Sequence, residues 1–376
     1  MIVALAALLL AACTTDQKRR DYLETVAEGY DTPPPRPVVI VPGFGVTRLL
    51  DPKLDHFVWG TAHATVQRHF EDDLDLPIAD DGTVGHDRLV PRGYVGSRGP
   101  INIGWLLREG LRKYGNYVPD RDVFMFEYDW RLSARDNAHA LGAFIDSVRH
   151  GGKVDVVTHS AGSLVALAYV KLDGGADKVE HLVLIAPPRR GVVDAFRIMV
   201  RPERFIFREF TPAMVATWPA VAELVPDNGR FLVDGRGASI NFDAWRGQDW
   251  TRYVSLDARH ERALTTSLKN ARRFRDTLRD TPMPPHVHLT VIAGDCVATA
   301  VRVLTRDDGT YVFYPSELRA DEKPLEHKLF ELGDGTVPVS SATAGEPATL
   351  FCDGHQGIAG DPNVHRALLR ILREPR

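Results

Sequence analysis

The sequence lacks an excess of positive charge, an internal repeat and an apolar run long enough to cross a bilayer. Its 46 Lys and Arg are opposed by 50 Asp and Glu, so the net charge is −4 and no basic field indicates a nucleic-acid partner. Metal ligands are also sparse: His286 and His288 share one face of a predicted strand, and no further ligand accompanies them. We therefore expect an enzyme or binding protein without a metal or other cofactor.

The first residues have the pattern of an export signal. The apolar stretch MIVALAALLLAAC is too short to span a membrane, and its end, LAAC, resembles a bacterial lipobox. On this interpretation residues 1–12 are a signal peptide, Cys13 is lipidated, and the polar, proline-rich residues 13–36 are a tether. Thr14 replaces the aspartate of inner-membrane retention, which favours a lipid-anchored envelope protein in the outer membrane, facing the periplasm. A secreted protein, or an unprocessed apolar tail, is the alternative.

Only three cysteines occur, and removing Cys13 leaves Cys296 and Cys352. Each follows a predicted strand near its carboxyl end. Disulfides persist in an exported protein, so we predict that the two residues pair if their strands are neighbours. Two buried free thiols are the alternative.

Apolar, β-branched runs alternate with helical patterns along the chain. Such runs are typical of strands buried on both faces of a parallel sheet, so the alternation predicts an α/β fold with a mostly parallel, doubly wound sheet. From 189 to 285 no buried strand is evident, which indicates a cap inserted over the carboxyl edge of the sheet within a catalytic domain of residues 37–376. The predicted strands are 36–43, 122–130, 154–160, 181–188, 288–294 and 348–354, and the predicted helices are 102–114, 135–149, 161–172, 259–279 and 361–373.

A serine stands between a predicted strand and a predicted helix in VDVVTHSAGSLVALAYV. Ser160, with Gly162 two places later, resembles the nucleophile elbow of α/β-hydrolases, although Thr158 replaces the usual glycine on the other side. A serine that merely caps the helix is the alternative. The elbow predicts an activated nucleophile, and its first oxyanion donor is then the backbone N–H of Ala161.

A nucleophilic serine requires a base and an acid later in the chain. His355 follows a predicted strand and precedes the last predicted helix, whereas His365 lies within that helix and is expected at the surface. Two acids are candidates: Asp295 directly follows a strand, and Asp334 lies in a Gly-Asp-Gly loop before the last strand. The residues alone leave this choice open.

Four segments together resemble the lecithin:cholesterol acyltransferase family, which includes phospholipase A2-like enzymes and bacterial lipases. They are PVVIVPGFGVTRLLDPKLD, FEYDWRLS, VVTHSAGSLVALAYV and GDGTVP, and they occur in order between about residues 37 and 372. The resemblance implies an α/β-hydrolase whose triad is Ser160, Asp334 and His355, and it implies Phe44 as the second oxyanion donor.

The resemblance also implies contacts with substrate. Trp59 corresponds in position to an aromatic lid loop of the family and is a candidate substrate contact. Trp130 is a second candidate, although Asp129 and Arg131 around it favour a structural ion pair with the tryptophan at the cap interface. The stretch 189–210 mixes arginine with aromatic residues, which suits either an anionic lipid surface or an ordinary cap helix.

The sequence thus predicts a serine hydrolase or O-acyltransferase acting on lipid acyl esters through an acyl-enzyme. The alternative is a catalytically silent envelope lipoprotein that uses the same fold to bind a lipid or a partner. The acyl chain length, the natural donor, the choice of water or alcohol as acceptor, and the oligomeric state are left open by the residues.

Overall fold

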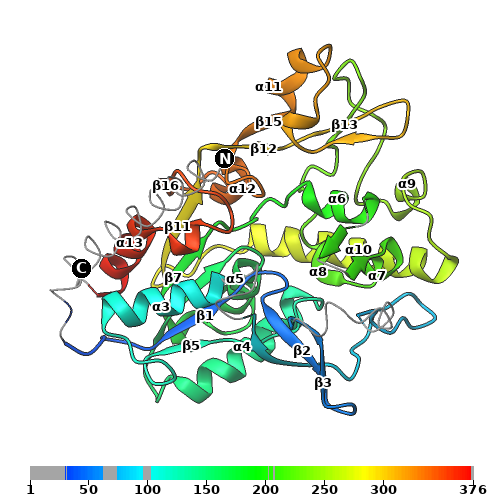
Figure 1. The fold of residues 1–376 in the computed structure, drawn as a ribbon. Helices are drawn as coiled ribbons and strands as arrows, with labels where there is room; N and C mark the ends of the chain where they lie inside the picture. The colour runs from blue at the N-terminus through cyan, green and yellow to red at the C-terminus, as the bar shows by residue number, and fades with distance from the viewer. Residues whose placement is uncertain are drawn as a thin grey trace, which may run out of the picture.

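Six parallel strands form the central sheet of the molecule, in the order β16-β11-β7-β6-β1-β5 (Figure 1). The computed structural model describes residues 30, 32–61, 74–95, 103–201, 203–205 and 208–373. All six strands predicted from the sequence take part, which confirms the α/β class and the doubly wound, parallel sheet. They are β1 (Val38–Val41), β5 (Val123–Met125), β6 (Val154–His159), β7 (Val179–Ile185), β11 (His288–Gly294) and β16 (Thr349–Phe351).

Helices cover both faces of this sheet. Alternate residues of β1 point to opposite sides: Val39 and Val41 join one hydrophobic core, and Val38 and Ile40 join the other. The first core includes α4 (Ala134–Val148) and α5 (Gly162–Leu172), and the second includes α3 (Ile103–Gly115) and α13 (Pro362–Arg373). Strands covered on both sides need apolar residues at every position, which explains the continuous VVIV run of β1.

One predicted strand is shorter than expected. The run 122–130 was expected to be a strand throughout, but β5 ends at Met125 and the chain then leaves the sheet. The hydroxyl of Tyr128 donates to the Pro42 carbonyl at 2.7 Å, and Asp129 binds the main-chain N–H and the guanidinium of Arg131. These side-chain bonds replace a strand ladder and confirm the structural ion pair.

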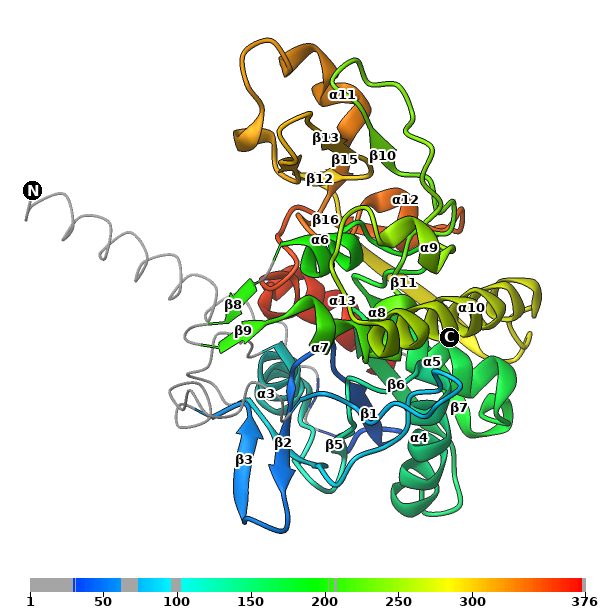
Figure 2. The same ribbon diagram turned by 90° about the vertical axis from the view of Figure 1, so that its right-hand side faces the viewer.

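Short strands that the sequence did not predict build four smaller sheets, in which every pair is antiparallel except β10 with β13. Two of these sheets lie with α11 at one end of the molecule in both views (Figures 1 and 2). The strands are β2 (Thr47–Asp51), β3 (His56–Trp59), β4 (Val90–Tyr94), β8 (Glu203–Phe205), β9 (Arg208–Phe210), β10 (Leu232–Val233), β12 (Val297–Ala300), β13 (Val303–Thr305), β14 (Tyr311–Val312) and β15 (Phe330–Gly333). The remaining helices outside the cap are α11 (Glu326–Leu329), α12 (Val339–Thr343) and the 3₁₀ turns η1 (Ala176–Lys178), η2 (Pro315–Glu317), η3 (Lys323–Leu325) and η4 (Ile358–Gly360).

The segment between β7 and β11, which contains the expected cap at 189–285, has its own aromatic core. Phe196 is fully buried and its ring contacts those of Phe231, Phe242, Trp250 and Tyr253. In the arginine-rich stretch 189–210, the described apolar side chains of Phe196, Met199 and Phe210 are all buried, which favours packing over a lipid-facing surface. The cap helices are α6 (Asp194–Val200), α7 (Pro212–Ala216), α8 (Pro219–Ala222), α9 (Gly247–Trp250) and α10 (Ala258–Asp280).

Buried polar groups join the cap to the sheet domain. The Glu223 carboxylate, next to α8, accepts from the N–H of Ala134 at the start of α4 at 2.7 Å. Burial raises the pKa of Glu223 to about 8, against the opposing effects of that N–H and of Arg275. Arg275 on α10 is buried as well and donates to the Glu223 carbonyl at 2.8 Å.

The N-terminal boundary differs from the expected one. Residues 32–36 were assigned to the tether, yet Arg36 pairs at 2.9 Å with Asp155, a fully buried carboxylate, and the Thr32 carbonyl accepts from Arg373 at 2.7 Å. A buried charge needs such a partner, so the end of the tether belongs to the folded domain.

The signal peptide and Cys13 lie outside the described residues. No helix in the described ranges combines the length and apolarity that a membrane crossing needs.

Cys296 and Cys352 are joined by a disulfide with a Cα–Cα distance of 5.0 Å. The pairing was predicted on the condition that the two strands are neighbours, and they are. β11 and β16 are hydrogen-bonded to each other, and each cysteine lies just beyond the carboxyl end of its strand. The bond therefore ties the edge strand to the interior of the sheet.

Replacing Cys352 by serine should lower the free energy of unfolding by about 4 kcal/mol, because the disulfide joins positions 56 apart and restricts the unfolded chain. Urea unfolding of the oxidised wild type and of Cys352→Ser measures the difference. Reductant should lower the wild-type midpoint and leave that of the variant unchanged. Equal midpoints for the oxidised wild type and the variant would refute a stabilising bond.

Candidate active site

Ser160 lies in a tight turn between β6 and α5. Its φ of +53° is in the left-handed region, which costs energy for a residue other than glycine and holds the side chain clear of the sheet. Gly162 makes the turn feasible: a Cβ there would lie 2.3 Å from the Pro42 carbonyl oxygen and 2.4 Å from that of Val41. The strand-turn-helix geometry of an elbow is thus present.

Thr158 does not widen this turn, although it replaces the glycine usual at that position. Its side chain is fully buried, and its hydroxyl is 2.6 Å from the hydroxyl of Ser163 in the first turn of α5. A small polar residue across the turn therefore accommodates the threonine. The departure from the common motif is compensated locally by a hydrogen bond between the strand and the helix.

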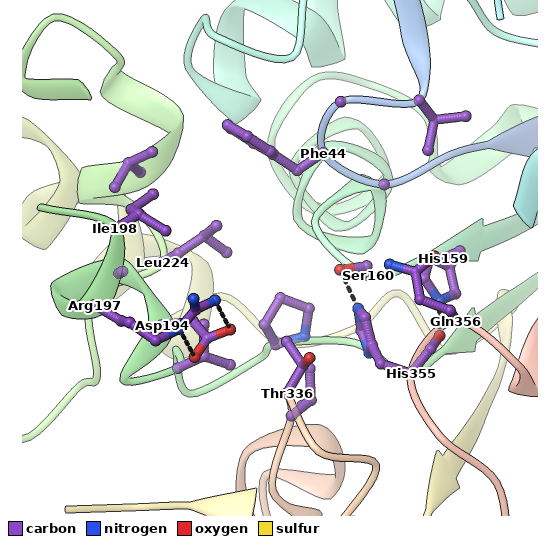
Figure 3. Close-up of a pocket in the computed structure, with 18 of the residues that line it drawn as sticks. Phe44, His159, Ser160, Asp194, Arg197, Ile198, Leu224, Thr336, His355 and Gln356 are labelled. Atoms are coloured by element: carbon purple, nitrogen blue, oxygen red, sulfur yellow. Dashed lines mark hydrogen bonds and ion pairs between the residues drawn. The ribbon is translucent and has the colours of Figure 1, made fainter. Parts of the chain in front are cut away.

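His355 connects the serine to an acid. Its Nε2 is 2.9 Å from the Ser160 hydroxyl (Figure 3). Its Nδ1 is 2.7 Å from Oδ2 of Asp334. Its backbone is held too, because its N–H donates to the Asp334 carbonyl at 2.8 Å and its carbonyl oxygen lies 3.0 Å from Nε2 of His159. Both ring nitrogens and both backbone polar atoms of His355 therefore have partners.

Asp334 is buried and oriented by the loop that follows it. Its Oδ1 accepts from the backbone N–H of Thr336 at 2.9 Å and of Val337 at 2.6 Å. Burial alone would raise the pKa of Asp334, but the charge and hydrogen bond of His355, with the two N–H groups, outweigh burial and hold the pKa below its usual value. The carboxylate therefore stays ionised next to the imidazole.

The structure distinguishes the two candidate acids. Asp334 contacts His355, whereas no described hydrogen bond or ion pair joins the Asp295 carboxylate to His355; the backbone N–H of Asp295 donates to the Phe351 carbonyl at 3.2 Å. Gly294, just before Asp295, allows the Asp334 loop to approach, since a Cβ on it would lie 2.7 Å from the Cβ of Asp334.

The two expected oxyanion donors lie on either side of the serine. Ala161 follows Ser160 directly, and the loop of Phe44 passes so close that a Cβ on Gly43 would be 3.0 Å from the Cβ of Ser160. Gly45 adopts a φ of +76°, which turns this loop over the serine. Among the hydrogen bonds of the described chain, none uses the N–H of Phe44 or of Ala161, so both are available to a ligand.

A cavity of about 280 Å³ opens above the serine. Ser160, His159, His355 and Gln356 lie on one side of it, and the cap faces them from the other (Figure 3). Its apolar wall consists of Phe44, Val46, Trp59, Val192, Ile198, Phe210, Val221 and Leu224. One ion pair interrupts this wall, where Arg197 binds both carboxylate oxygens of Asp194 at 2.9–3.0 Å.

Of the two tryptophans considered as substrate contacts, only Trp59 lines the cavity. Its indole N–H donates to the Gly45 carbonyl at 2.7 Å and so braces the loop of Phe44. Trp130 lies behind this layer, in contact with the rings of Phe44, Trp59 and Trp218 of the cap. Its place corrects the expectation of substrate contact and supports the role at the cap interface.

Sequence analysis missed His159, the residue before the serine. Its side chain is buried, its ring centroid is 4.8 Å from that of His355, and its Nδ1 has no partner among the described residues. Burial, followed by the nearby His355, lowers the pKa of His159 to about 3, so this ring is neutral. In the sequence, the one feature that could have pointed to His159 as a residue of the site is its position directly before Ser160.

His365 also differs from expectation. It was assigned to the surface, but its Nε2 lies 2.7 Å from the Ala359 carbonyl and its side chain packs under α3, where a Cβ on Gly110 would touch the ring. Burial lowers the pKa of His365.

Within the described ranges, no group of three or more His, Cys, Asp or Glu side chains is arranged to hold a metal ion.

Residues 106–235 match the family model of lecithin:cholesterol acyltransferase (LCAT). The chain has an α/β-hydrolase fold and is similar to this family over the matched segment. The matched segment contains Ser160 and the first part of the cap, so the resemblance is confirmed there, while Phe44, Asp334 and His355 lie outside it. No curated protein matches the sequence.

Several solved structures are similar to this chain at low sequence identity. The crystal structure of the Tle4–Tli4 complex is 16% identical, with a TM-score of 0.59, and the match covers 89% of this chain and 97% of that chain. A lipase of Bacillus licheniformis in its mature form is 13% identical, with a TM-score of 0.44 and coverage of 91% and 95%. A metagenomic carboxyl esterase is 15% identical, with a TM-score of 0.42 and coverage of 90% and 75%.

Acid should destabilise the protein through His159. Its pKa is depressed in the folded state, so below the ordinary value of about 6.5 the unfolded chain binds more protons, and stability falls as the pH drops from there towards 3. Each such histidine adds up to about 1.4 kcal/mol per pH unit to the slope. Urea unfolding of His159→Asn between these limits should show a slope smaller by about that amount. His139→Asn, at an exposed position, is the control variant. Identical slopes of unfolding free energy against pH for His159→Asn and the wild type would contradict the expectation.

Proposed function

We propose that this protein is a serine-dependent carboxylic-ester hydrolase with O-acyltransferase capacity, acting on lipid acyl esters. The proposal depends on one observation above all: Ser160, His355 and Asp334 form an unbroken hydrogen-bonded series at the floor of a largely apolar cavity. A buried carboxylate, an imidazole and a serine in this order are the groups that acyl transfer through an acyl-enzyme requires.

In the first step Ser160 Oγ attacks the ester carbonyl while His355 Nε2 accepts its proton. Asp334 holds the ring through Nδ1 and stabilises the imidazolium. The N–H groups of Phe44 and Ala161 stabilise the oxyanion of the tetrahedral intermediate, which collapses to an acyl-serine as His355 returns the proton to the departing alcohol. In the second step water gives up a proton to His355 and attacks the acyl-serine, which releases the fatty acid and regenerates the serine.

The cavity favours an acyl chain as the occupant next to the serine. Its wall carries aromatic and aliphatic side chains from both the Phe44 loop and the cap, and burial of each methylene there is worth about 0.8 kcal/mol. A lipid-like alcohol can serve as acceptor in place of water when the same surface binds it. We further propose that Cys13 anchors the enzyme in the cell envelope, where such esters are present.

A fluorophosphonate probe tests the central proposal. Purified wild type should be labelled on Ser160, and Ser160→Ala should not be labelled, because only an activated serine reacts. Thr158→Ser, which keeps the hydroxyl contact of the elbow, is the matched control and should retain labelling. A wild type that is folded but unlabelled would support the silent lipoprotein instead.

The two candidate acids should differ in effect. Asp334→Asn should lower kcat on a soluble ester by orders of magnitude, about 10⁴-fold in a well-characterised triad, because the imidazole loses its orienting charge. Asp295→Asn should cost far less. Steady-state kinetics of both variants measure this, and a larger loss for Asp295→Asn would overturn the assignment.

Cys13→Ser should move the protein from the membrane fraction to a soluble or unprocessed form, because the serine cannot carry a thioether-linked lipid. Fractionation, together with the mass of the N-terminal peptide, measures the change. An unmodified N-terminal peptide and unchanged fractionation of the variant would rule out the anchor.

Hydrolysis should exceed transfer unless the acceptor is lipid-like. Water is present at about 55 M, and only a positioned alcohol with a high effective molarity competes with it. A phospholipid with a labelled acyl chain, supplied with a long-chain alcohol, gives new ester and free fatty acid whose ratio is the measurement. Dominant new ester at low alcohol concentration would show that transfer is the main reaction.

A further inference from the structure

A second cavity, of about 220 Å³, lies outside the active site where the cap joins the sheet domain. Its lining comes from one side of α5, the chain just after β7, Asp227, the carboxyl end of α10 with the residues that follow it, and the residues after α12. Figure 1 shows α10 reaching α5 from the cap. The cavity thus touches both segments through which the cap is connected, near residues 189–190 and 281–283.

The lining of this cavity is rich in positive charge. Five cationic side chains line it against two carboxylates. Both carboxylates are already paired, Asp227 with Arg275 at 2.5 Å and Glu346 with Arg189 at 3.0 Å. Arg279, also in the lining, pairs with Asp276 and Asp280 beside the cavity.

Two cations have no carboxylate partner in the described part of the chain. Lys171 on α5 donates to the Leu278 carbonyl at the end of α10, and Arg190 donates to the Ala344 carbonyl at 3.3 Å. Burial, and then the charge of Arg189, lowers the pKa of Lys171, against the opposing effects of Glu346 and Asp280, neither of which pairs with the ammonium. An anion in the cavity would remove this repulsion and occupy the remaining donors.

We infer that this cavity binds a phosphate-bearing anion. A dianion matches the two unpaired cations in charge, and the guanidinium and ammonium donors around it are those that proteins use for phosphate. Because the lining includes both connections of the cap, the bound anion would hold them to each other and to α5, which begins two residues after Ser160. The site is distinct from the catalytic cavity and does not depend on the proposed function.

Thermal unfolding of the full chain in sodium phosphate and in pyrophosphate, with sodium chloride added to constant ionic strength, tests the site. We expect Tm to rise with anion concentration, as mass action requires for a ligand of the folded state. Lys171→Met and Arg190→Gln should each weaken the apparent affinity about 10- to 100-fold, the range for loss of one charge-assisted hydrogen bond. Lys269→Met and Arg272→Gln, at exposed positions of α10, are matched controls and should respond as the wild type does.

Vesicles of phosphatidylglycerol distinguish a lipid headgroup from a free phosphate. Co-sedimentation that requires Lys171 and Arg190, without a Tm response to the inorganic anions, would assign the site to a headgroup. Hydrogen exchange gives a second measurement: the bound anion should slow exchange in residues 189–193 and 279–284. Responses that are equal in Lys171→Met and Lys269→Met, or no response to any of the three probes, would overturn the proposal.

Discussion

The left-handed backbone of Ser160 is the constraint on which the site depends. For α5 to begin two residues after Ser160, its first turn must lie against the carbonyl oxygens of Val41 and Pro42 at the end of β1, and the absent side chain of Gly162 permits the contact. The same approach brings Gly43 onto the serine, so the loop of Phe44 has little freedom. One steric requirement therefore positions both the Ser160 hydroxyl and the loop of Phe44 beside it.

The other half of the site depends on the parallel order of the sheet. The carboxyl ends of β6, β11 and β16 lie at one edge, so residues far apart in sequence meet there. His355 then needs only a short loop to reach Ser160, and its backbone is fixed between Asp334 and His159. Because His159 is neutral in the folded state, it supports the loop without adding a second positive charge next to the imidazole.

Structural elements with a long apolar or β-branched pattern could be predicted from the sequence. Short strands and single buried side chains could not. The six core strands are β-branched runs, so their class and order of appearance follow from the sequence. By contrast, β12 and β15, which carry the chain to Asp334, have four residues each and no distinctive pattern. The residues left the choice open because Asp295 follows a predicted strand and Asp334 lies in a tight loop before one, and only the resemblance favoured Asp334. His365 was misjudged, and the substrate contact considered for Trp130 was not excluded, because burial behind a first layer of side chains has no periodic signal.

The disulfide has a further consequence for the histidine. β16 has three residues and lies at the edge of the sheet, where strands fray most readily. His355 is three positions beyond Cys352, whose sulfur is bonded to the end of β11. Even if the hydrogen bonds of β16 open, only three residues separate His355 from the bonded cysteine. Its Cα therefore stays within roughly 10 Å of the Cα of Cys352. Fraying of the edge strand therefore displaces His355 only a short distance, and its ring stays within a small volume around Ser160.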